Sequence, residues 1–365
     1  MEYILIEECC DILDSRRIPI TASDRMSGPY PYYGANGVQD YVADYIFDDE
    51  LVLLAEDGGN FGSKTRPIAY RVSGKCWVNN HAHVLKPMAS MDVDYLCYSL
   101  MFYDTGELVN GATRQKLTQT AMRKMLIPQR SLQEQKRIVC ELSKVQSIIS
   151  ARQQQLQKLD ELVKARFVEL FGDPQRNPHG YKHTKLSDIA TYYNGLTYKP
   201  ENVAEEGTIV LRSSNIQNSQ LDFADTVRVD CAIKERLMVQ KNDILMCSRN
   251  GSAKLVGKVA LIKDTQEPMS FGAFMMIIRS HYFGYLMTYF QMDAFRQQIK
   301  TSATTTINQI TGRMLDDVTI PLPPMALVDQ FAAFVEQTDK SKVAVQKALD
   351  EAQLLFDSLM QKYFG

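Results

Sequence analysis

The sequence predicts an α+β fold in which two mixed α/β globular domains are separated by an antiparallel pair of long coiled-coil helices, as a pseudo-twofold internal repeat. Three observations lead to this prediction: features recur at one offset of 193 residues, each repeat ends in a long heptad pattern, and short apolar runs precede each heptad. A length of 365 residues suits about two domains. A hydrophobic fraction of 45% with 23% charged residues is typical of a folded chain.

The repeat rests on matches that share one offset over more than 120 residues. Each match is weak alone because identity is low, but a common offset over such a span rarely arises by chance. The matches are 49–53 with 242–246, 57–58 with 250–251, 84–86 with 277–279, Thr113 with Thr306, 117–118 with 310–311, 127–128 with 320–321, and 171–172 with 364–365.

Residues 1–130 are predicted to form the first globular domain. Short apolar runs alternate with Gly, Asn and Asp, which is typical of strands joined by turns. The expected strands are 51–55, 69–72 and 78–85, and the segment near 94–103 has a helical pattern.

Residues 131–172 are predicted to form the first long helix, and residues 325–365 the second. In each, eight of ten positions at alternating spacings of four and three residues are apolar, and no Pro or Gly occurs within 131–171 or 325–364. A helix of about 40 residues is about 60 Å long. The two apolar stripes would most simply pack against each other, and antiparallel pairing would place the two domains at opposite ends of a dumbbell. The polar residues that interrupt the stripes, and that could fix the register, are Arg152, Arg166, Thr338 and Lys342.

Residues 173–184 are predicted to be a linker, because this stretch is rich in Pro, Asn and Gly. Residues 185–324 are predicted to form the second globular domain. Its expected strands are 244–247, 255–262 and 274–278, and a helical segment is expected near 282–301.

Charge and composition exclude several classes of protein. The net charge is −2. Residues 1–130 contain 17 acidic and 13 basic residues, and residues 173–324 contain 15 acidic and 17 basic residues. Because neither region is strongly basic, any DNA-binding site must be a local group of residues. No run of about 18 apolar residues predicts a membrane span. The first eight residues contain no Lys or Arg, so no secretory signal is expected. Seven cysteines without a C-x-x-C pair predict reduced thiols and a cytoplasmic location.

Motifs along the whole chain carry a resemblance to a known family. The chain resembles the specificity (S) subunit of type I restriction–modification enzymes, through the order of its motifs more than through one diagnostic motif. The motifs are 13–20, 32–37, 57–62, 77–85, 127–138, 159–167, 171–174, 212–216, 242–246, 304–310 and 355–360.

This resemblance implies that each globular domain is a target recognition domain that reads one half of a split, asymmetric sequence in double-stranded DNA. It implies that the helices set the half-site spacing and dock two methyltransferase subunits, through which restriction subunits join. The chain itself would perform no chemistry and would hold no cofactor. S-adenosylmethionine, ATP and Mg would be bound by the partner subunits.

In the first domain, candidate DNA contacts combine glycines that allow close backbone approach with amide, aromatic and basic side chains. The alternative is a set of ordinary turns with partly buried tyrosines. Residues 57–65 do not match a nucleotide-binding loop, because Ser63 and not Gly precedes Lys64. The candidates are Tyr32, Tyr33, Asn36, Gly58, Gly59, Asn60, Ser63, Lys64, Asn80, His81, Arg114 and Lys116.

In the second domain, arginine suits guanine or phosphate, and asparagine suits adenine. For the threonines, helix capping is the alternative. The candidates are Arg212, Ser214, Asn215, Arg249, Asn250, Lys254, Thr305, Thr306 and Asn308.

Other functions receive less support from the sequence. His81 and His83 could share a metal, but no carboxylate or cysteine completes a recognisable ligand set. A stand-alone methyltransferase should carry an N/D-P-P-Y/F motif and a glycine-rich cofactor loop, and neither occurs. A nuclease needs an acidic partner for an E-x-K motif, and the single such motif, at Glu134, has none that suits. A coiled-coil scaffold without a DNA role is the remaining alternative.

Overall fold

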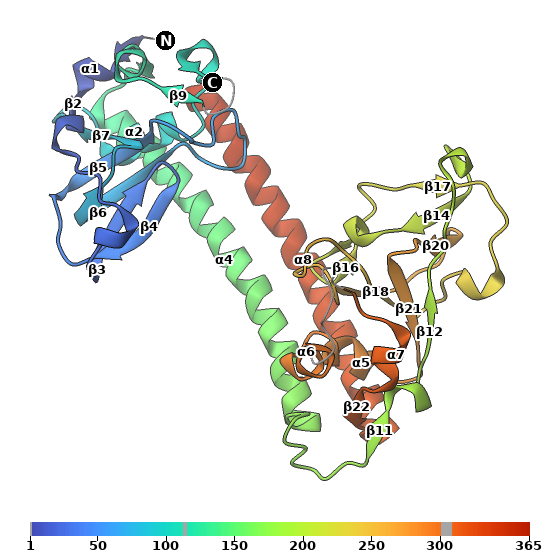
Figure 1. The fold of residues 1–365 in the computed structure, drawn as a ribbon. Coiled ribbons are helices and arrows are strands. Elements are labelled where there is room, and N and C mark those ends of the chain that lie inside the picture. Colours follow the sequence, from blue (N-terminus) through green and yellow to red (C-terminus); the bar gives the residue numbers. More distant parts are fainter. Residues whose placement is uncertain (1, 112–114, 301–308) are drawn as a thin grey trace. The chain divides into compact units, whose positions relative to one another are not determined.

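The structure is a computed structural model that describes residues 2–111, 115–300 and 309–365 (Figure 1). The chain divides into two compact units, Met1–Gln154 with Gln346–Gly365, and Gln155–Val345. Both divisions fall inside the long helices. Each unit therefore contains one globular domain and one end of each helix; the unit with Met1–Gln154 is unit 1, and Gln155–Val345 is unit 2.

Unit 1 is built on a mixed sheet with strand order β2-β7-β5-β6-β3-β4. Strands β3 and β6 are parallel, with Tyr32 opposite Trp77, whereas the other neighbours are antiparallel. Its elements are β1 (Tyr3–Leu5), α1 (Ile6–Cys9), β2 (Cys10–Ile12), β3 (Ser27–Gly34), β4 (Gly37–Val42), β5 (Phe47–Ala55), β6 (Ala69–Val78), β7 (Ala82–Pro87), α2 (Val93–Met101), β8 (Val109–Asn110), β9 (Lys116–Leu117), α3 (Gln119–Arg123), β10 (Leu126–Pro128), the start of α4 (Leu132–Phe171) and the end of α8 (Met325–Phe364).

Both faces of the central strand β5 are buried. Val52 and Leu54 pack in the cluster that includes α2, α4 and α8, whereas Leu51 and Leu53 pack in a cluster on the opposite face. Successive side chains of a strand point to opposite faces. An unbroken apolar run is therefore what a strand covered on both sides requires, and residues 51–55 supply it.

Unit 2 contains two four-stranded sheets within its described residues, with strand orders β12-β21-β18-β19 and β13-β17-β14-β20. Its elements are the end of α4, the start of α8, β11 (His183–Lys185), β12 (Thr191–Asn194), β13 (Val203–Ala204), β14 (Thr208–Leu211), β15 (Ile216–Gln217), β16 (Gln220–Leu221), β17 (Arg228–Val229), β18 (Ile244–Cys247), β19 (Val259–Leu261), β20 (Met269–Phe271), β21 (Met275–Arg279), α5 (Phe283–Tyr289), α6 (Asp293–Lys300), α7 (Gly312–Asp316) and β22 (Thr319–Pro321).

Strand β18 in unit 2 corresponds to β5 in unit 1 and is also buried on both faces. Its odd and even side chains divide between two core clusters. Aromatic rings join one of these cores to the long helices: Phe167 of α4 lies 5.0 Å from Tyr285 of α5 and 5.6 Å from Phe331 of α8, between ring centroids. The helix ends are thus part of the core of unit 2.

The predicted repeat is confirmed by elements at the same offset, although the sheets of the two units differ in strand order. Helices α4 and α8, helices α3 and α7, and strands β10 and β22 each begin 193 residues apart. Tyrosines of α2 and α5, which are 190 residues apart, make matching bonds to prolines that are 193 apart: Tyr95 donates to the Pro128 carbonyl and Tyr285 to the Pro321 carbonyl, each at 2.9 Å. The two globular domains therefore share one framework.

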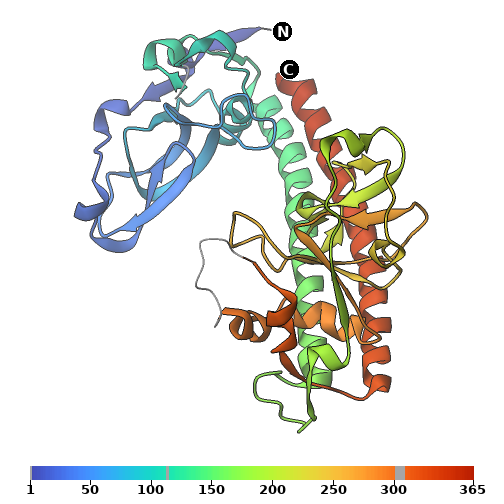
Figure 2. The same cartoon turned by 45° about the vertical axis from the view of Figure 1, so that its right-hand side comes forward.

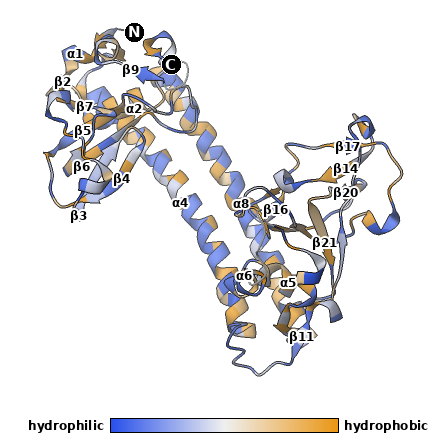
Figure 3. Cartoon of the chain, in the orientation of Figure 1, coloured by the Kyte–Doolittle hydropathy of each residue, from blue (hydrophilic) through white to orange (hydrophobic). Residues whose placement is uncertain are grey.

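The two long helices pair antiparallel within each unit. In unit 1 the start of α4 lies beside the end of α8, where Tyr363 donates to Glu141 at 2.6 Å (Figure 2). In unit 2 the end of α4 lies beside the start of α8, where Lys342 and Asp160 form an ion pair at 2.6 Å. Both helices carry hydrophilic and hydrophobic patches (Figure 3). The predicted helix pair is confirmed, and the distance that it sets between the two domains stays a prediction.

Some expected elements differ in detail. A turn at 79–81 separates β6 from β7, so residues 78–85 are not one strand; the Asn79 side chain accepts the His81 N–H at 2.8 Å and stabilises this turn. Residues 255–258 are not strand, because Gly257 has a φ of +82° and ends a turn before β19. The helical segment near 282–301 is two helices, α5 and α6. Within the described residues, no helix is both long and apolar enough to cross a membrane.

Candidate nucleic-acid interface

Loops from separate parts of unit 1 meet where strand β5 ends. The Asn36 side chain donates to the Gly58 carbonyl at 3.0 Å. His81 Nδ1 lies 2.6 Å from Asp57 Oδ1, and Asp57 forms an antiparallel bridge with Lys116. Four predicted residues, Asn36, Gly58, His81 and Lys116, therefore lie in one region, which together with Asp57 we call edge 1.

A buried histidine lies beneath edge 1. His83 has no exposed surface; its Nδ1 is 2.6 Å from Asp14 Oδ2, and its Nε2 is 2.9 Å from the Leu117 carbonyl oxygen. Both neighbours offer an oxygen to a ring nitrogen of His83. Asp14 also accepts the Val84 N–H at 2.9 Å. His83 thus ties strand β9 to the beginning of the chain.

Glu56, the residue after β5, lies between the buried pair of His83 and Asp14 and the exposed residue Lys116. Arg17 donates to Glu56 Oε2 at 2.6 Å, and Lys116 Nζ lies 3.0 Å from Glu56 Oε1. Burial by itself raises the pKa of Glu56, but the hydrogen bonds from Arg17 and Lys116 outweigh it and lower the pKa below its ordinary value. For Asp14 burial acts in the same way, and the hydrogen bond and charge of His83 lower its pKa. Both carboxylates are therefore ionised and paired.

The structure corrects one sequence-based argument about metal binding. Carboxylates do lie beside His83: ligand atoms of Asp14, Glu56 and His83 are all within 4.8 Å of one another. However, Arg17 and Lys116 already supply positive charge to these carboxylates. A divalent cation would have to displace them, so the donor set fits an internal ion network better than a metal site.

In unit 2 the corresponding region combines arginine, asparagine and an aromatic ring. Arg249 donates to Gln309 Oε1 through Nη2 at 2.7 Å, and its guanidinium carbon lies 5.9 Å from the centre of the Phe274 ring. The Asn250 side chain donates to Ser213 Oγ at 3.4 Å. We call this region, Arg249, Asn250, Ser213, Phe274 and Gln309, edge 2.

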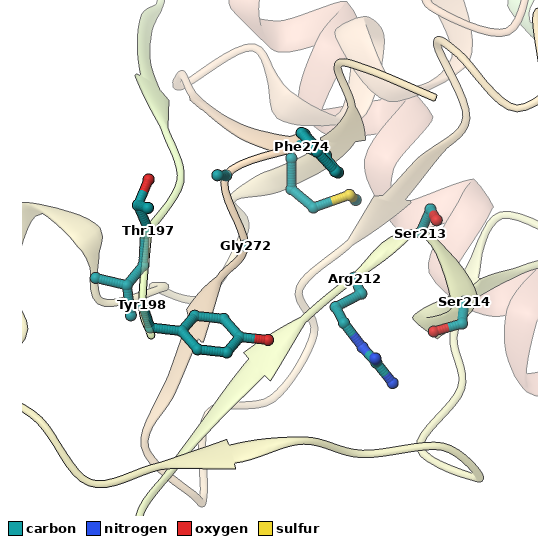
Figure 4. A pocket seen from close by; sticks show the side chains of 10 residues that line it. Thr197, Tyr198, Arg212, Ser213, Ser214, Gly272 and Phe274 are labelled. Carbon is teal, nitrogen blue, oxygen red and sulfur yellow. The ribbon is translucent and has the colours of Figure 1, made fainter. Parts of the chain in front are cut away.

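A pocket of about 370 Å³ opens beside edge 2 (Figure 4). Residues 196–198, 212–214 and 272–275 line it, and they include Tyr198, Arg212 and Ser214. The Arg212 side chain donates to Asp225 at 2.7 Å. Aromatic and cationic side chains around an open pocket can hold an unsaturated ring or a phosphate.

Edges 1 and 2 occupy equivalent places in the repeat but carry different charges. In unit 1 Asp57 bridges to Lys116, and in unit 2 Arg249, one residue before the position equivalent to Asp57, bridges to Gln309. At the offset of 193, the position of Glu56 is occupied by Arg249 in unit 2, that of Asp57 by Asn250, and that of Lys116 by Gln309. The shared framework thus presents two chemically different surfaces.

Two predicted contact residues are buried and are removed from the candidate site. Tyr32 is 1% exposed, and its hydroxyl accepts the Ile20 N–H. Asn215 is 1% exposed; its amide nitrogen donates to the Asp222 and Asp225 carbonyls, and its side-chain oxygen accepts the Arg212 N–H. Both predictions were wrong because the side chains are used within the protein.

Several other predicted residues have structural roles that sequence alone did not separate from binding. A Cβ on Gly59 would lie 2.4 Å from the Ala55 Cβ, so Gly59 is needed for packing. The Asn60 side chain donates to the Pro67 carbonyl at 3.5 Å, and Ser63 Oγ accepts the Arg66 N–H at 2.9 Å. The half-buried Tyr33 stacks on Tyr70.

The remaining predicted residues fall into two groups. The first is exposed and consists of Lys64, Asn80, Ser214, Arg249 and Lys254. The second lies outside the described residues and consists of Arg114, Thr305, Thr306 and Asn308.

Sequence reasoning missed several residues of edge 2 and its pocket. Gln309, Ser213, Phe274 and Tyr198 were not selected as site residues, although Phe274 is 60% exposed. A large apolar residue at the start of an expected strand gives no sign of exposure. Applying the repeat offset to Lys116 would have selected Gln309.

Comparison with known proteins agrees with this architecture. The family model described as "Type I restriction modification DNA specificity domain" matches residues 1–161 and 178–352. A crystal structure of the S subunit of a type I restriction–modification system from M. genitalium matches with a TM-score of 0.62 at 16% identity, covering 100% of this chain and 96% of that one. At this identity the match shows a shared fold.

Two curated relatives match over part of the chain. A putative type I restriction enzyme specificity subunit of Haemophilus influenzae is 36% identical over 139 residues, covering 38% of this chain and 36% of the relative. The EcoKI specificity subunit of Escherichia coli K12 is 28% identical over 183 residues, covering 47% of this chain and 39% of the relative. The chain thus spans less than half the length of these two relatives.

Proposed function

Because the chain belongs to the family of type I restriction modification DNA specificity domains, we propose that it is the specificity subunit of a type I restriction–modification complex. In this role it reads a bipartite, asymmetric target in double-stranded DNA, with one half-site for each unit. The family model covers a large part of both units. The names of the curated relatives support the same role.

The observation that carries this proposal is the combination of a common framework with different edges. Two copies of one fold suit two related sites on one ligand, and different side chains at equivalent positions suit two different base sequences. Base edges differ in their hydrogen-bond donors and acceptors, so different side chains select different bases. A symmetric partner would instead favour identical edges.

We propose that exposed and half-buried residues of both units contact DNA. In unit 1 the proposed contacts are Tyr33, Asn36, Gly58, Lys64, Asn80, His81 and Lys116. In unit 2 they are Arg212, Ser214, Arg249, Asn250 and Lys254. Arg114, Thr305, Thr306 and Asn308 stay in the proposal on sequence grounds. Because neither domain is strongly basic, the partner subunits would supply much of the phosphate contact.

In the proposed complex this chain has no catalytic role. Two methyltransferase subunits dock on the paired helices, and restriction subunits join through them. S-adenosylmethionine, ATP and Mg are bound by those partners, and the complex acts in the cytoplasm. The seven free cysteines are compatible with a reducing compartment.

The test is a map of adenine methylation in cells with and without this gene, together with its methyltransferase partner. A split motif that depends on the gene is expected. Exchanging residues 1–130 for the first domain of another family member should change one half of the motif only. Absence of any gene-dependent motif, or a change in both halves, would contradict the proposal.

A further inference from the structure

Arg249 is held in one orientation by both its backbone and its side chain. Its N–H donates to the Phe274 carbonyl at 3.1 Å, and its backbone bridges to Gln309. Along one side of the guanidinium, Nε at 3.2 Å and Nη2 at 2.7 Å donate to the same oxygen, Gln309 Oε1. An arginine fixed in this way loses little conformational entropy when it binds a ligand.

The bonds to Gln309 leave the end of the guanidinium available. Nη1 and the second hydrogen of Nη2 form a pair of parallel donors, and the residue is exposed. Among the described residues, Arg249 is within 4 Å of no carboxylate oxygen, so its charge is not neutralised by an ion pair there. A ligand with two adjacent acceptors would match this donor pair.

We propose that Arg249 reads a guanine in the half-site bound by unit 2, and that Gln309 is the positioning residue. This inference rests on the proposed function. Guanine presents O6 and N7 as adjacent acceptors in the major groove, which match the two free donors of Arg249. The exposed Phe274 ring beside the guanidinium is placed to contact the thymine methyl group of a neighbouring base pair.

Unit 1 has no arginine at the position equivalent to Arg249. The residue equivalent to Arg249 is Glu56, whose carboxylate is held by Arg17 and Lys116. The Lys116 ammonium is a point charge already paired with a carboxylate, and it lacks the fork of an arginine. The guanine read by an arginine–glutamine pair therefore belongs to one half-site only.

The experiment uses the complex of the full chain with its methyltransferase partner and a duplex that carries the mapped target. In each guanine of the unit 2 half-site, 7-deazaguanine replaces guanine and so removes the N7 acceptor. We expect one position at which this replacement weakens binding by about tenfold or more. At that position Arg249→Ala should be insensitive to the replacement, and Gln309→Leu should be less sensitive than the wild type. Arg236→Ala, which removes an exposed arginine of unit 2 outside edge 2, should keep full sensitivity.

Three results would overturn the inference and leave the proposed function intact. The first is a gene-dependent split motif without a guanine on either strand of the unit 2 half-site. The second is a wild-type complex that is indifferent to 7-deazaguanine at every position, a result that does not depend on the folding of any variant. The third is an Arg249→Ala complex that remains as sensitive as the wild type.

Discussion

Replacing His83 with methionine tests whether the buried ion network stabilises unit 1. Methionine is the residue at the equivalent position of unit 2, where Met276 lies in an apolar core. In His83→Met the Asp14 carboxylate loses its closest partner, at 2.6 Å, and the Leu117 carbonyl loses its hydrogen bond. Removing one partner of a buried ion pair costs about 3–5 kcal/mol. For a unit of this size, that corresponds to a melting temperature lower by roughly 6–20 °C.

The assay is urea unfolding followed by fluorescence, since the chain contains one tryptophan, Trp77, which lies in unit 1. The matched control is Lys86→Met on the same strand, β7. Lys86 pairs with Asp49 at 2.6 Å, but the Lys86 side chain is 43% exposed, so its loss should cost less than about 1 kcal/mol. If His83→Met and Lys86→Met destabilise unit 1 equally, the reasoning about the buried network is wrong.

The pH dependence of the same transition gives a second readout. The pKa values of Asp14 and Glu56 are lower in the folded protein than the ordinary values of 3.8 and 4.5. Their contribution to stability is therefore present above those ordinary values and is lost as the pH falls through the lower folded values. In His83→Met the contribution of Asp14 should be smaller, so the free energy of unfolding should fall less over this range than in the wild type.

Three further predictions concern the aromatic core, the repeated tyrosine bond and the surface pair of edge 1. Phe167→Ala should destabilise unit 2 by about 3–5 kcal/mol, because the buried ring would leave a cavity; hydrogen exchange of unit 2 amides checks this, and unchanged protection would contradict it. Tyr285→Phe should cost about 1 kcal/mol in calorimetry through loss of the bond to Pro321, and no change would show that the bond contributes nothing. Glu56→Gln should free Lys116 for phosphate contact and steepen the salt dependence of DNA binding by about one unit of slope, and an unchanged slope would exclude Lys116 as a phosphate contact.

The parts of the fold that depend on local pattern were predicted correctly from the sequence. The two long helices follow from heptad spacing, because the side chains of one helical face recur every three or four residues. The repeat follows from one offset, which relates α3 to α7 and β10 to β22 as well as the helices. The unbroken apolar run at 51–55 predicts a strand, and the structure shows why the run is unbroken: both faces of that strand are buried.

The contents of the candidate site could be predicted only in part. Asn36 and Tyr32 are four residues apart in one glycine-rich segment, yet Asn36 reaches edge 1 and Tyr32 is buried. Tyr32 lies within β3, where its side chain is buried, whereas Asn36 lies in the turn between β3 and β4. Residue type gives the chemistry of a side chain but not the direction in which it points.

The sequence by itself determined the duplicated domains and the stiff helices, because periodicity and repetition are properties of neighbouring or regularly spaced residues. Only the tertiary structure decided that Asp14, Glu56 and His83 form one buried network and that Gln309 holds Arg249. The reason is physical: these groups are separated by up to 69 residues along the chain, and strand pairing brings them within hydrogen-bonding distance.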